Sequence, residues 1–398
     1  MEHKTRIKGN VHYVGVNDRN KHRFEGMWPL PYGVSYNSYL IDDEMVALVD
    51  TVDICYFEVY LRKIKQVIGE RPINYLIINH MEPDHSGSIR LIKQHYPEII
   101  IVGNKQTFGM IEGFYGVTGE QYLVKEGDFL ALGHHKLRFY MTPMVHWPET
   151  MMTFDETDGV LFSGDGFGCF GTVDGGFLDT RINVDKYWGE MVRYYSNIVG
   201  KYGSPVQKAL QKLGGLPISA ICSTHGPVWT ENIAKVIGIY DRLSRYDADE
   251  GVVIAYGSMY GNTEQMAEAI AEELSAQGVK NIVMHNVTKS HPSYILADIF
   301  RYKGLIIGSP TYSNQIFPEV EALLSKILLR EVKGRYLGYF GSFTWAGAAV
   351  KRLAEFAEKS KFELVGDPVE MKQAMRDITY TQCENLARAM ADRLKKDR

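Results

Sequence analysis

At 398 residues the chain is longer than one hydrophobic core usually organises, so two domains are the first expectation. With 45% hydrophobic and 23% charged residues it has the composition of an ordinary globular protein, which excludes a disordered or fibrous chain. The net charge of -4 and the lack of a long basic run argue against nucleic-acid binding.

The first part of the sequence predicts a strand-rich domain. Residues 34–50 predict two strands around an acidic turn, residues 56–70 an amphipathic helix, and residues 73–80 a buried strand ending at His80. Further strands with polar or titratable ends are predicted within 98–104, 129–143, 151–165 and 218–226. Short strands in two layers with helices between them indicate an αββα sandwich whose site lies along one sheet edge.

The polar segment 244–251 interrupts this pattern, and we place there the boundary between two domains, 1–248 and 252–398. Beyond it, apolar strands alternate with amphipathic helices. The strands are expected at 252–258, 281–287, 304–309, 336–343 and 362–366, and the helices at 262–278, 318–330 and 346–360. Such alternation predicts a doubly wound parallel sheet of five strands.

The sequence contains neither a membrane segment nor a paired cysteine motif. The N-terminal stretch MEHKTRIKGN lacks an apolar signal-peptide region, and no run of eighteen apolar residues occurs. The cysteines, Cys55, Cys169, Cys222 and Cys383, form no C-x-x-C pair, which is typical of a reducing compartment. We therefore expect a cytoplasmic protein in which any metal is bound by histidine and carboxylate side chains.

The densest group of titratable residues lies in NHMEPDHSGSI, directly after the buried strand 73–80. His80, Glu82, Asp84 and His85 can supply four ligands from one strand-to-helix turn, because alternate positions of an extended segment point the same way. Burying four titratable groups without a cation would be costly. The cluster therefore predicts a metal site.

Later strand ends offer three more candidate ligands, His146, Asp165 and His225, each beside a turn that contains Gly or Pro. Two metal ions held close together need ligands from several strand ends and a carboxylate that bridges them. A lone histidine such as His225 can equally be a hydrogen-bonded or surface residue. His134 and His135, in GHHKL, are interpreted as an exposed turn.

The cluster H-x-E-x-D-H is similar to the H-x-H-x-D-H zinc pattern of the metallo-β-lactamase-like fold, with Glu82 at the position of the middle histidine. An oxygen ligand in place of imidazole shifts the preference of the site away from zinc and toward iron or manganese.

Three loops of the second domain predict a flavin site. The loop SMYGNTEQMA follows a strand and opens a helix, so backbone N–H groups with the side chains of Ser258, Asn262 and Thr263 can hold a phosphate monoester. The sequence has neither a P-loop nor a dinucleotide fingerprint. Two further loops bring Tyr312 and Trp345 to the same sheet edge, where they can flank an isoalloxazine ring, although an aromatic rim used for packing is the alternative.

These three loops resemble those of flavodoxins, which bind FMN. The resemblance implies cofactor-binding residues Ser258, Met259, Tyr260, Gly261, Asn262, Thr263, Pro310, Thr311, Tyr312, Asn314, Ser342, Phe343, Thr344, Trp345, Ala346 and Gly347.

A metallo-β-lactamase-like domain with H-x-E-x-D-H, followed by a flavodoxin-like domain, resembles the flavodiiron proteins, also called A-type flavoproteins. The resemblance spans nearly the whole chain. It implies that His80, Glu82 and His146 bind one iron, that Asp84, His85 and His225 bind the other, and that Asp165 bridges them. His85 differs from the other six residues, because in some members of the family the equivalent histidine points away from the metal.

For function, the resemblance implies reduction of nitric oxide to N₂O, of dioxygen to water, or of both, as protection against nitrosative or oxidative stress. It implies a head-to-tail homodimer, or a dimer of dimers, in which the flavin of one subunit meets the iron site of the other. Without a C-x₂-C pair no appended rubredoxin module is expected, so electrons are expected from a separate donor, rubredoxin or reduced deazaflavin F₄₂₀ (F₄₂₀H₂).

Several alternatives stay open at this point. A zinc hydrolase of the metallo-β-lactamase or glyoxalase II type is the main rival, and an electron carrier whose first domain only scaffolds is the other. Trp147 can lie near the incoming flavin or in the core, and Tyr195 is a candidate to support the metal ligands.

Overall fold

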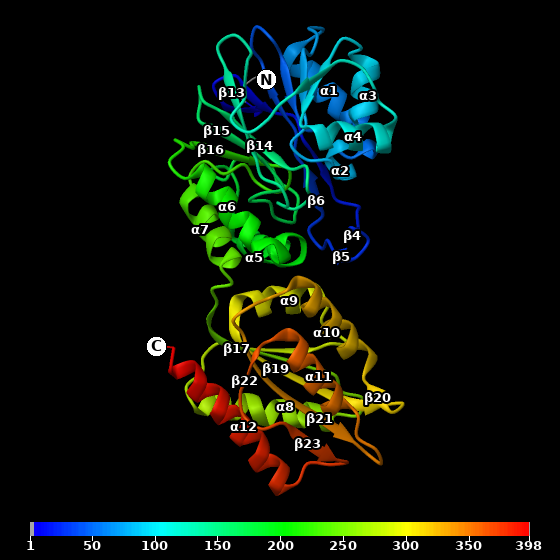
Figure 1. Ribbon diagram of the computed structural model, residues 1–398, viewed down its shortest axis with the longest axis vertical. Coiled ribbons are helices and arrows are strands. Elements are labelled where there is room, and N and C mark those ends of the chain that lie inside the picture. Colours follow the sequence, from blue (N-terminus) through cyan, green and yellow to red (C-terminus); the bar gives the residue numbers. More distant parts are fainter. Residues whose placement is uncertain (1–3, 398) are drawn as a thin grey trace. The chain divides into compact units, whose positions relative to one another are not determined.

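The computed structural model describes residues 4–397 and divides the chain into two compact units (Figure 1). One unit comprises the residues up to Tyr195 together with Tyr202–Asp241, and the other comprises Ser196–Lys201 and the residues from Arg242 onward. The outermost positions of the predicted domains, 1–3 and 398, lie outside the described residues. Within the described part, no helix is both long and apolar enough to cross a membrane.

The first unit contains two large sheets. The first sheet consists, in spatial order, of β1 (Arg6–Lys8), β2 (Val11–Tyr13), β7 (Tyr39–Ile41), β8 (Ala47–Val49), β9 (Tyr75–Ile77), β10 (Ile100–Gly103) and β11 (Gln121–Leu123). The second consists of β12 (Phe129–Ala131), β13 (Lys136–Met141), β14 (Met151–Asp155), β15 (Val160–Gly164) and β16 (Ala220–Ser223). Two small antiparallel pairs join β3 (Val16–Asp18) to β6 (Val34–Tyr36) and β4 (Arg23–Phe24) to β5 (Trp28–Pro29).

The core of the first unit lies between the two sheets. Val49 and Ile77 from the first sheet and Phe139 and Phe162 from the second belong to one buried cluster. In β13, alternate side chains are buried, which is the pattern expected of a strand with one face on the core. Each fully buried side chain of this kind contributes roughly 1.5–3 kcal/mol, so this layer holds the two sheets together. The two-sheet sandwich predicted from the sequence is confirmed.

The helices of the first unit form two groups, one of α1, α3 and α4 and one of α5, α6 and α7 (Figure 1). They are α1 (Phe57–Ile68), α2 (Pro83–Ser86), α3 (Ile89–His95), α4 (Lys105–Tyr115), α5 (Asp185–Tyr194), α6 (Gly203–Leu213) and α7 (Ile233–Ser244). In α1 the buried residues Phe57, Tyr60, Ile64 and Ile68 recur every three or four positions, so one face of the helix packs on the core.

The second unit is a doubly wound parallel sheet. Its strands are β18 (Ile282–Asn286), β17 (Asp249–Tyr256), β19 (Tyr302–Tyr312), β21 (Tyr336–Phe343), β22 (Glu363–Leu364) and β23 (Val369–Lys372), with the short β20 (Gln315–Ile316) antiparallel to β19. The helices are α8 (Asn262–Ala276), α9 (Pro292–Arg301), α10 (Pro318–Arg330), α11 (Ala349–Ser360) and α12 (Asp377–Lys395). The spatial order places β17 between β18 and β19, which makes the carboxyl ends of β17 and its neighbours the usual ligand-binding edge.

The parallel sheet of five strand positions is confirmed, with two differences in detail. The fifth position is shared by β22 and β23, which pair one after the other with β21, so the predicted strand 362–366 covers only part of it. Strand β17 begins at Asp249, inside the predicted linker 244–251, because Asp249 already pairs with Tyr302.

Candidate metal centre and cofactor pocket

The turn between β9 and α2 carries four of the predicted ligands. β9 ends at Ile77, and Pro83 at the first position of α2 supplies the backbone angle with which a helix begins. His80 and Glu82 therefore lie in the connecting turn, and Asp84 and His85 lie in the helix. All four side chains are buried.

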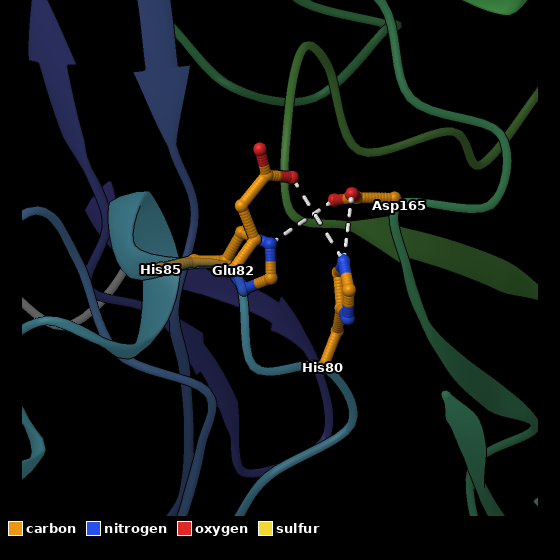
Figure 2. A group of neighbouring side chains, drawn as sticks. All are labelled: His80, Glu82, His85 and Asp165. Atoms are coloured by element: carbon orange, nitrogen blue, oxygen red, sulfur yellow. Dashed lines mark ion pairs between the residues drawn. The ribbon is translucent and has the colours of Figure 1, made fainter. Parts of the chain in front are cut away.

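The other three predicted ligands come from three later loops, and the structure brings all seven together. His146 lies between β13 and β14, Asp165 directly after β15, and His225 two residues after the end of β16. Ligand atoms of His80, Glu82, His85 and Asp165 lie within 4.8 Å of one another, and so do those of Asp84, His85 and His225. Figure 2 shows the first of these groups, with its side chains directed toward one another.

Asp165 lies between two sets of ligands. Its Oδ2 is 2.9 Å from His146 Nε2 and 3.5 Å from His80 Nε2. Its Oδ1 is 3.3 Å from His85 Nε2 and 3.5 Å from His225 Nε2, and it accepts a hydrogen bond from Thr224. One carboxylate thus directs one oxygen to each set, the arrangement required of a bridging ligand.

Two acidic side chains complete the sets. Glu82 Oε2 lies 3.2 Å from His146 Nε2 and 3.9 Å from His80 Nε2. Asp84 Oδ2 lies 3.3 Å from His225 Nε2, and its Oδ1 lies 3.7 Å from His85 Nε2. Each set therefore holds two histidines and one carboxylate. His85 points into this cluster rather than away from it (Figure 2).

The donor atoms of the cluster fit metal cations. Among residues 4–397, the buried polar atoms without a hydrogen-bond partner include Nε2 of His80 and His225, both ring nitrogens of His85 and both carboxylate oxygens of Asp84. Such orphaned groups are rare in folded proteins and cost about 1–3 kcal/mol each. Cations held in the cluster would satisfy the Nε2 atoms and the Asp84 oxygens; His85 Nδ1 lies on the other side of its ring, away from these ligands.

The charges within the cluster also favour metal binding. Burial and the charge of Asp84 raise the pKa of Glu82 to about 7. Burial opposes protonation of His85, but the charges of Asp165 and Asp84 outweigh it and raise the pKa of this histidine to about 10. Metals bind the deprotonated forms of such ligands, so protons and cations compete for the same atoms.

Two ligand histidines are oriented through their other ring nitrogen. His80 Nδ1 donates to the buried Glu149 carboxylate, with Nδ1 and Oε1 separated by 2.6 Å, and His225 Nδ1 donates to the backbone oxygen of Ser35 at 2.8 Å. In both rings these bonds leave Nε2 directed at the cluster. Sequence reasoning missed Glu149, although it follows the ligand His146 by three positions in HWPE.

Aromatic rings border the ligands. The half-buried Trp147 ring lies 5.2 Å from the His80 ring, edge to face, so it borders the metal cluster. The predicted supporting residue Tyr195 instead packs against Tyr240, at 5.1 Å. Its neighbour Tyr194 takes the expected place, because its ring lies 5.8 Å from that of His225.

An open cavity of about 630 Å³ leads to the metal cluster. It is lined by Lys21, Phe24, Glu25, Asp53, Ile54, Glu82, Pro83, Asp84, Gly87, Arg90, Leu91, Phe114 and Tyr115. The Phe24 ring lies edge to face with His225 at 5.3 Å. Ile54 and Phe114 are more than half exposed, so the cavity has an apolar rim.

A second cavity of about 360 Å³ lies in the second unit, at the carboxyl ends of β17, β19 and β21. It is lined by Met259, Tyr260, Asn262, Thr263, Pro310, Thr311, Tyr312, Ser313, Asn314, Ser342, Phe343, Thr344, Trp345, Ala346 and Gln373. Most of the predicted cofactor-binding residues are thus brought together. Ser258, Gly261 and Gly347 are not in its lining, and Ser313 and Gln373 are lining residues that sequence reasoning missed.

The three loops form a cradle suited to a phosphorylated aromatic cofactor. Helix α8 begins at Asn262, and Thr263 Oγ1 lies 2.8 Å from Ser342 Oγ, which joins two of the loops. Ser258 Oγ instead accepts the Gly261 N–H at 3.1 Å and so shapes the loop from within. The Trp345 side chain is 83% exposed at the rim, as expected for a ring that has a ligand to cover.

The interpretation of GHHKL as an exposed turn is wrong for His135. This side chain is buried, and its Nδ1 donates to Asp155 Oδ2 at 2.9 Å, with Asp158 close by. Burial disfavours the charged ring, but the Asp155 bond and the neighbouring carboxylates outweigh it and raise the pKa of His135. His134 is exposed, as expected.

Comparison with known proteins gives the same division of the chain. Residues 34–226 match the model of the ODP family beta lactamase, and residues 254–386 match that of flavodoxin. The chain is 33% identical over 363 residues to the anaerobic nitric oxide reductase flavorubredoxin of Vibrio vulnificus, covering 90% of this chain and 73% of that protein.

Solved structures agree over the full length. The rubredoxin oxygen:oxidoreductase of Desulfovibrio gigas is 31% identical, with a TM-score of 0.94 and coverage of 98% of both chains. The flavodiiron protein of Giardia intestinalis is 27% identical, with a TM-score of 0.92 and coverage of 98% of this chain and 97% of that one.

Proposed function

The chain belongs to the flavodiiron proteins, and from this we propose that it reduces nitric oxide to N₂O, dioxygen to water, or both. It is an oxidoreductase whose family carries a non-haem diiron centre and FMN. The observation that carries the proposal is the position of Asp165, which directs one oxygen to each of two histidine and carboxylate sets. A site for one metal ion would have no use for that arrangement, and Glu82 at the position of the middle histidine favours iron over the two zinc ions of a hydrolase.

The proposed ligand sets follow the distances. One iron would be held by His80, Glu82 and His146 and the other by Asp84, His85 and His225, with Asp165 between them. When bound, two ferrous ions and reduced FMN supply the two electrons that convert two NO to N₂O or the four that convert O₂ to water.

The residues around the irons would admit a small gas and help to protonate the products. The cavity beside Glu82 and Asp84 gives a route from solvent. Tyr194 is buried beside Phe24, a lining residue of this cavity, and the charge of Asp165 acts on its hydroxyl. Both reductions consume protons, so we assign to the Tyr194 hydroxyl the role of hydrogen-bond donor to the bound gas.

In the second unit, the cradle of α8 and its two neighbouring loops would hold FMN. The N–H groups at the start of α8, with Asn262 and Thr263, are suited to the phosphate. Tyr312 and Trp345 are suited to flank the isoalloxazine ring. We assign residues 1–248 to the diiron domain and 252–398 to the FMN domain.

A head-to-tail homodimer, or a dimer of dimers, is proposed as the assembly. The metal cavity has the exposed rim of Ile54 and Phe114, and the cofactor cavity has that of Tyr260 and Trp345. Exposed apolar rims of this kind mark interaction surfaces, and pairing them would bring FMN of one subunit toward iron of the other.

The remaining parts of the proposal concern the surroundings of the enzyme. We propose a separate donor, rubredoxin or F₄₂₀H₂, and a role in protection against nitrosative or oxidative stress in the cytoplasm. The name of the Desulfovibrio gigas protein pairs it with rubredoxin. The cysteines of the described residues are unpaired, which fits a reducing compartment.

The test is anaerobic turnover by the purified dimeric protein with measured iron and FMN content. The protein is reduced, NO or O₂ is added separately, and gas consumption and products are measured. We expect consumption of at least one gas and its loss in Asp165→Ala. Failure of the replete protein to consume either gas, or two zinc ions with thioester hydrolysis, would overturn the proposal in favour of a hydrolase.

A further inference from the structure

Glu149 is a buried carboxylate attached to one ligand histidine. Its Oε1 accepts from His80 Nδ1, at 2.6 Å, and from the Met81 N–H, at 2.9 Å. Its backbone oxygen accepts from Asn104 Nδ2 at 2.6 Å, and Asn104 in turn caps the start of α4. The backbone and one side-chain oxygen of Glu149 are thus both held by hydrogen bonds, and the solvent exposure of the residue is 0%.

The second carboxylate oxygen of Glu149 makes the arrangement unusual. Oε2 is buried and has no hydrogen-bond partner among residues 4–397. An ionised carboxylate with one unsatisfied oxygen is expensive to bury unless positive charge lies nearby. The His80 ring is the group that can bring such charge, because its Nε2 faces the metal cluster.

The set formed by Asp84, His85 and His225 has no carboxylate hydrogen-bonded to the Nδ1 of its histidines among the described residues. His225 Nδ1 donates to a neutral acceptor, the backbone oxygen of Ser35, at 2.8 Å. His85 Nδ1 is buried without a partner among the described residues. The geometry of the two sets is therefore similar, but only the set that contains His80 has a carboxylate hydrogen-bonded to the second ring nitrogen of an imidazole. The buried Asp50 acts on His85 through its charge, without a hydrogen bond to its ring.

We propose that Glu149 makes the two metal positions unequal, strengthening the one held by His80, Glu82 and His146. A carboxylate that accepts the Nδ1 proton of an imidazole makes Nε2 a stronger donor to a metal, and such outer partners typically change metal affinity by about 10–100-fold. Glu149 acts through His80, so it is a positioning residue. The inference rests on the proposed diiron site, but it concerns metal affinity and not gas reduction.

The variant Glu149→Gln tests the negative charge of Glu149 separately from its hydrogen bonds. Glutamine has nearly the same shape and keeps a carbonyl oxygen that can accept from His80 and Met81, so it keeps both hydrogen bonds and removes the negative charge, with an amide NH₂ in the place of Oε2. Asp179→Asn is the control for loss of a buried negative charge elsewhere in the same unit, and it also tests general destabilisation, because both Asp179 oxygens accept N–H groups and an amide NH₂ cannot. Asp179 is a buried carboxylate of the same unit that accepts N–H groups of residues 230–232 and contacts none of the metal ligands.

The experiment is zinc titration of the metal-depleted, FMN-bound full-length protein by calorimetry, followed by Mössbauer spectroscopy of the diferrous form. We expect two unequal zinc sites in the unmodified protein. In Glu149→Gln the tighter site should weaken about 10–100-fold, the second should stay within about threefold, and one of two ferrous signals should move. Asp179→Asn should change neither site.

Three results would overturn the inference. They are two zinc sites of equal affinity in the unmodified protein, an unchanged tighter site in Glu149→Gln, and equal weakening of both sites as a consequence of general destabilisation. Loss of gas turnover with the two unequal sites intact would count against the proposed function alone, so the two failures can be told apart.

Discussion

Replacing Tyr194 with Phe removes one buried hydroxyl and leaves the contacts of the ring in place. The side chain is fully buried, and its ring packs edge to face on Phe170 at 5.0 Å and beside His225 at 5.8 Å. The hydroxyl has no hydrogen-bond partner among residues 4–397. Burial, with the charge of Asp165, holds its pKa well above the usual value, so it is a neutral donor.

The expected effect on stability is a gain. A buried hydroxyl without a partner costs about 1–3 kcal/mol, and phenylalanine does not incur that cost. For a unit of this size, each kcal/mol shifts the melting temperature by about 2–4 °C, so the first unit of the metal-depleted protein should melt about 2–12 °C higher. Differential scanning calorimetry measures this shift.

The expected effect on catalysis is a loss. A hydrogen bond to a charged group is worth about 1.5–3 kcal/mol, so turnover of the preferred gas should fall about 10–100-fold. Tyr195→Phe is the control. Because Tyr195 packs against Tyr240, this variant should leave turnover unchanged. If Tyr194→Phe melts at or below the temperature of the unmodified protein, the inference that the Tyr194 hydroxyl is unsatisfied is wrong. If Tyr194→Phe keeps full turnover, the hydroxyl is not a donor in the reaction.

Three further predictions test other parts of the structure. Glu82→His restores the middle imidazole of the zinc pattern, so the zinc-to-iron ratio found by metal analysis should rise about tenfold, the effect of about 1.4 kcal/mol; an unchanged ratio contradicts the role given to Glu82. Thr263→Val should weaken FMN binding about 10–100-fold in fluorescence titrations, through loss of a hydroxyl bond to phosphate, whereas Thr263→Ser should bind almost normally. His135→Gln should destabilise the protein most below about pH 6.5, the pKa of a histidine in the unfolded chain. The pKa of His135 is raised in the folded protein, so the stabilisation that the protonated ring provides is lost as pH rises through that folded pKa. Urea unfolding at about pH 5.5 and about pH 9 measures it, and an equal effect at both contradicts the raised pKa.

Much of the fold and of the candidate site could be predicted from local sequence. The period of apolar residues distinguishes strands from helices, and the change from a strand-rich region to regular alternation marks the second unit. The metal candidates could be found because they lie in the segments that follow strands, several of them directly at a turn, as Asp165 does after β15. Those positions are where a sheet presents side chains at its edge.

Other features depend on contacts between distant parts of the chain. Adjacent residues on a helix point about 100° apart, so the packing around the end of α5, and not the local sequence, decides that Tyr194 faces His225 while Tyr195, the next residue, faces Tyr240. The burial of His135 depends on Asp155, across a strand pair, which accepts a hydrogen bond from its Nδ1.

The sequence by itself determined the two fold classes, the residue types of the metal cluster and the loops of the cofactor cradle, because these follow from local periodicity and turn chemistry. Only the tertiary structure decided that Asp165 directs its two oxygens to different ligand sets and that Glu149 is hydrogen-bonded to His80 and to no other metal ligand among the described residues. Those relations are set by the packing of the two sheets, which brings residues far apart in the chain within hydrogen-bond distance.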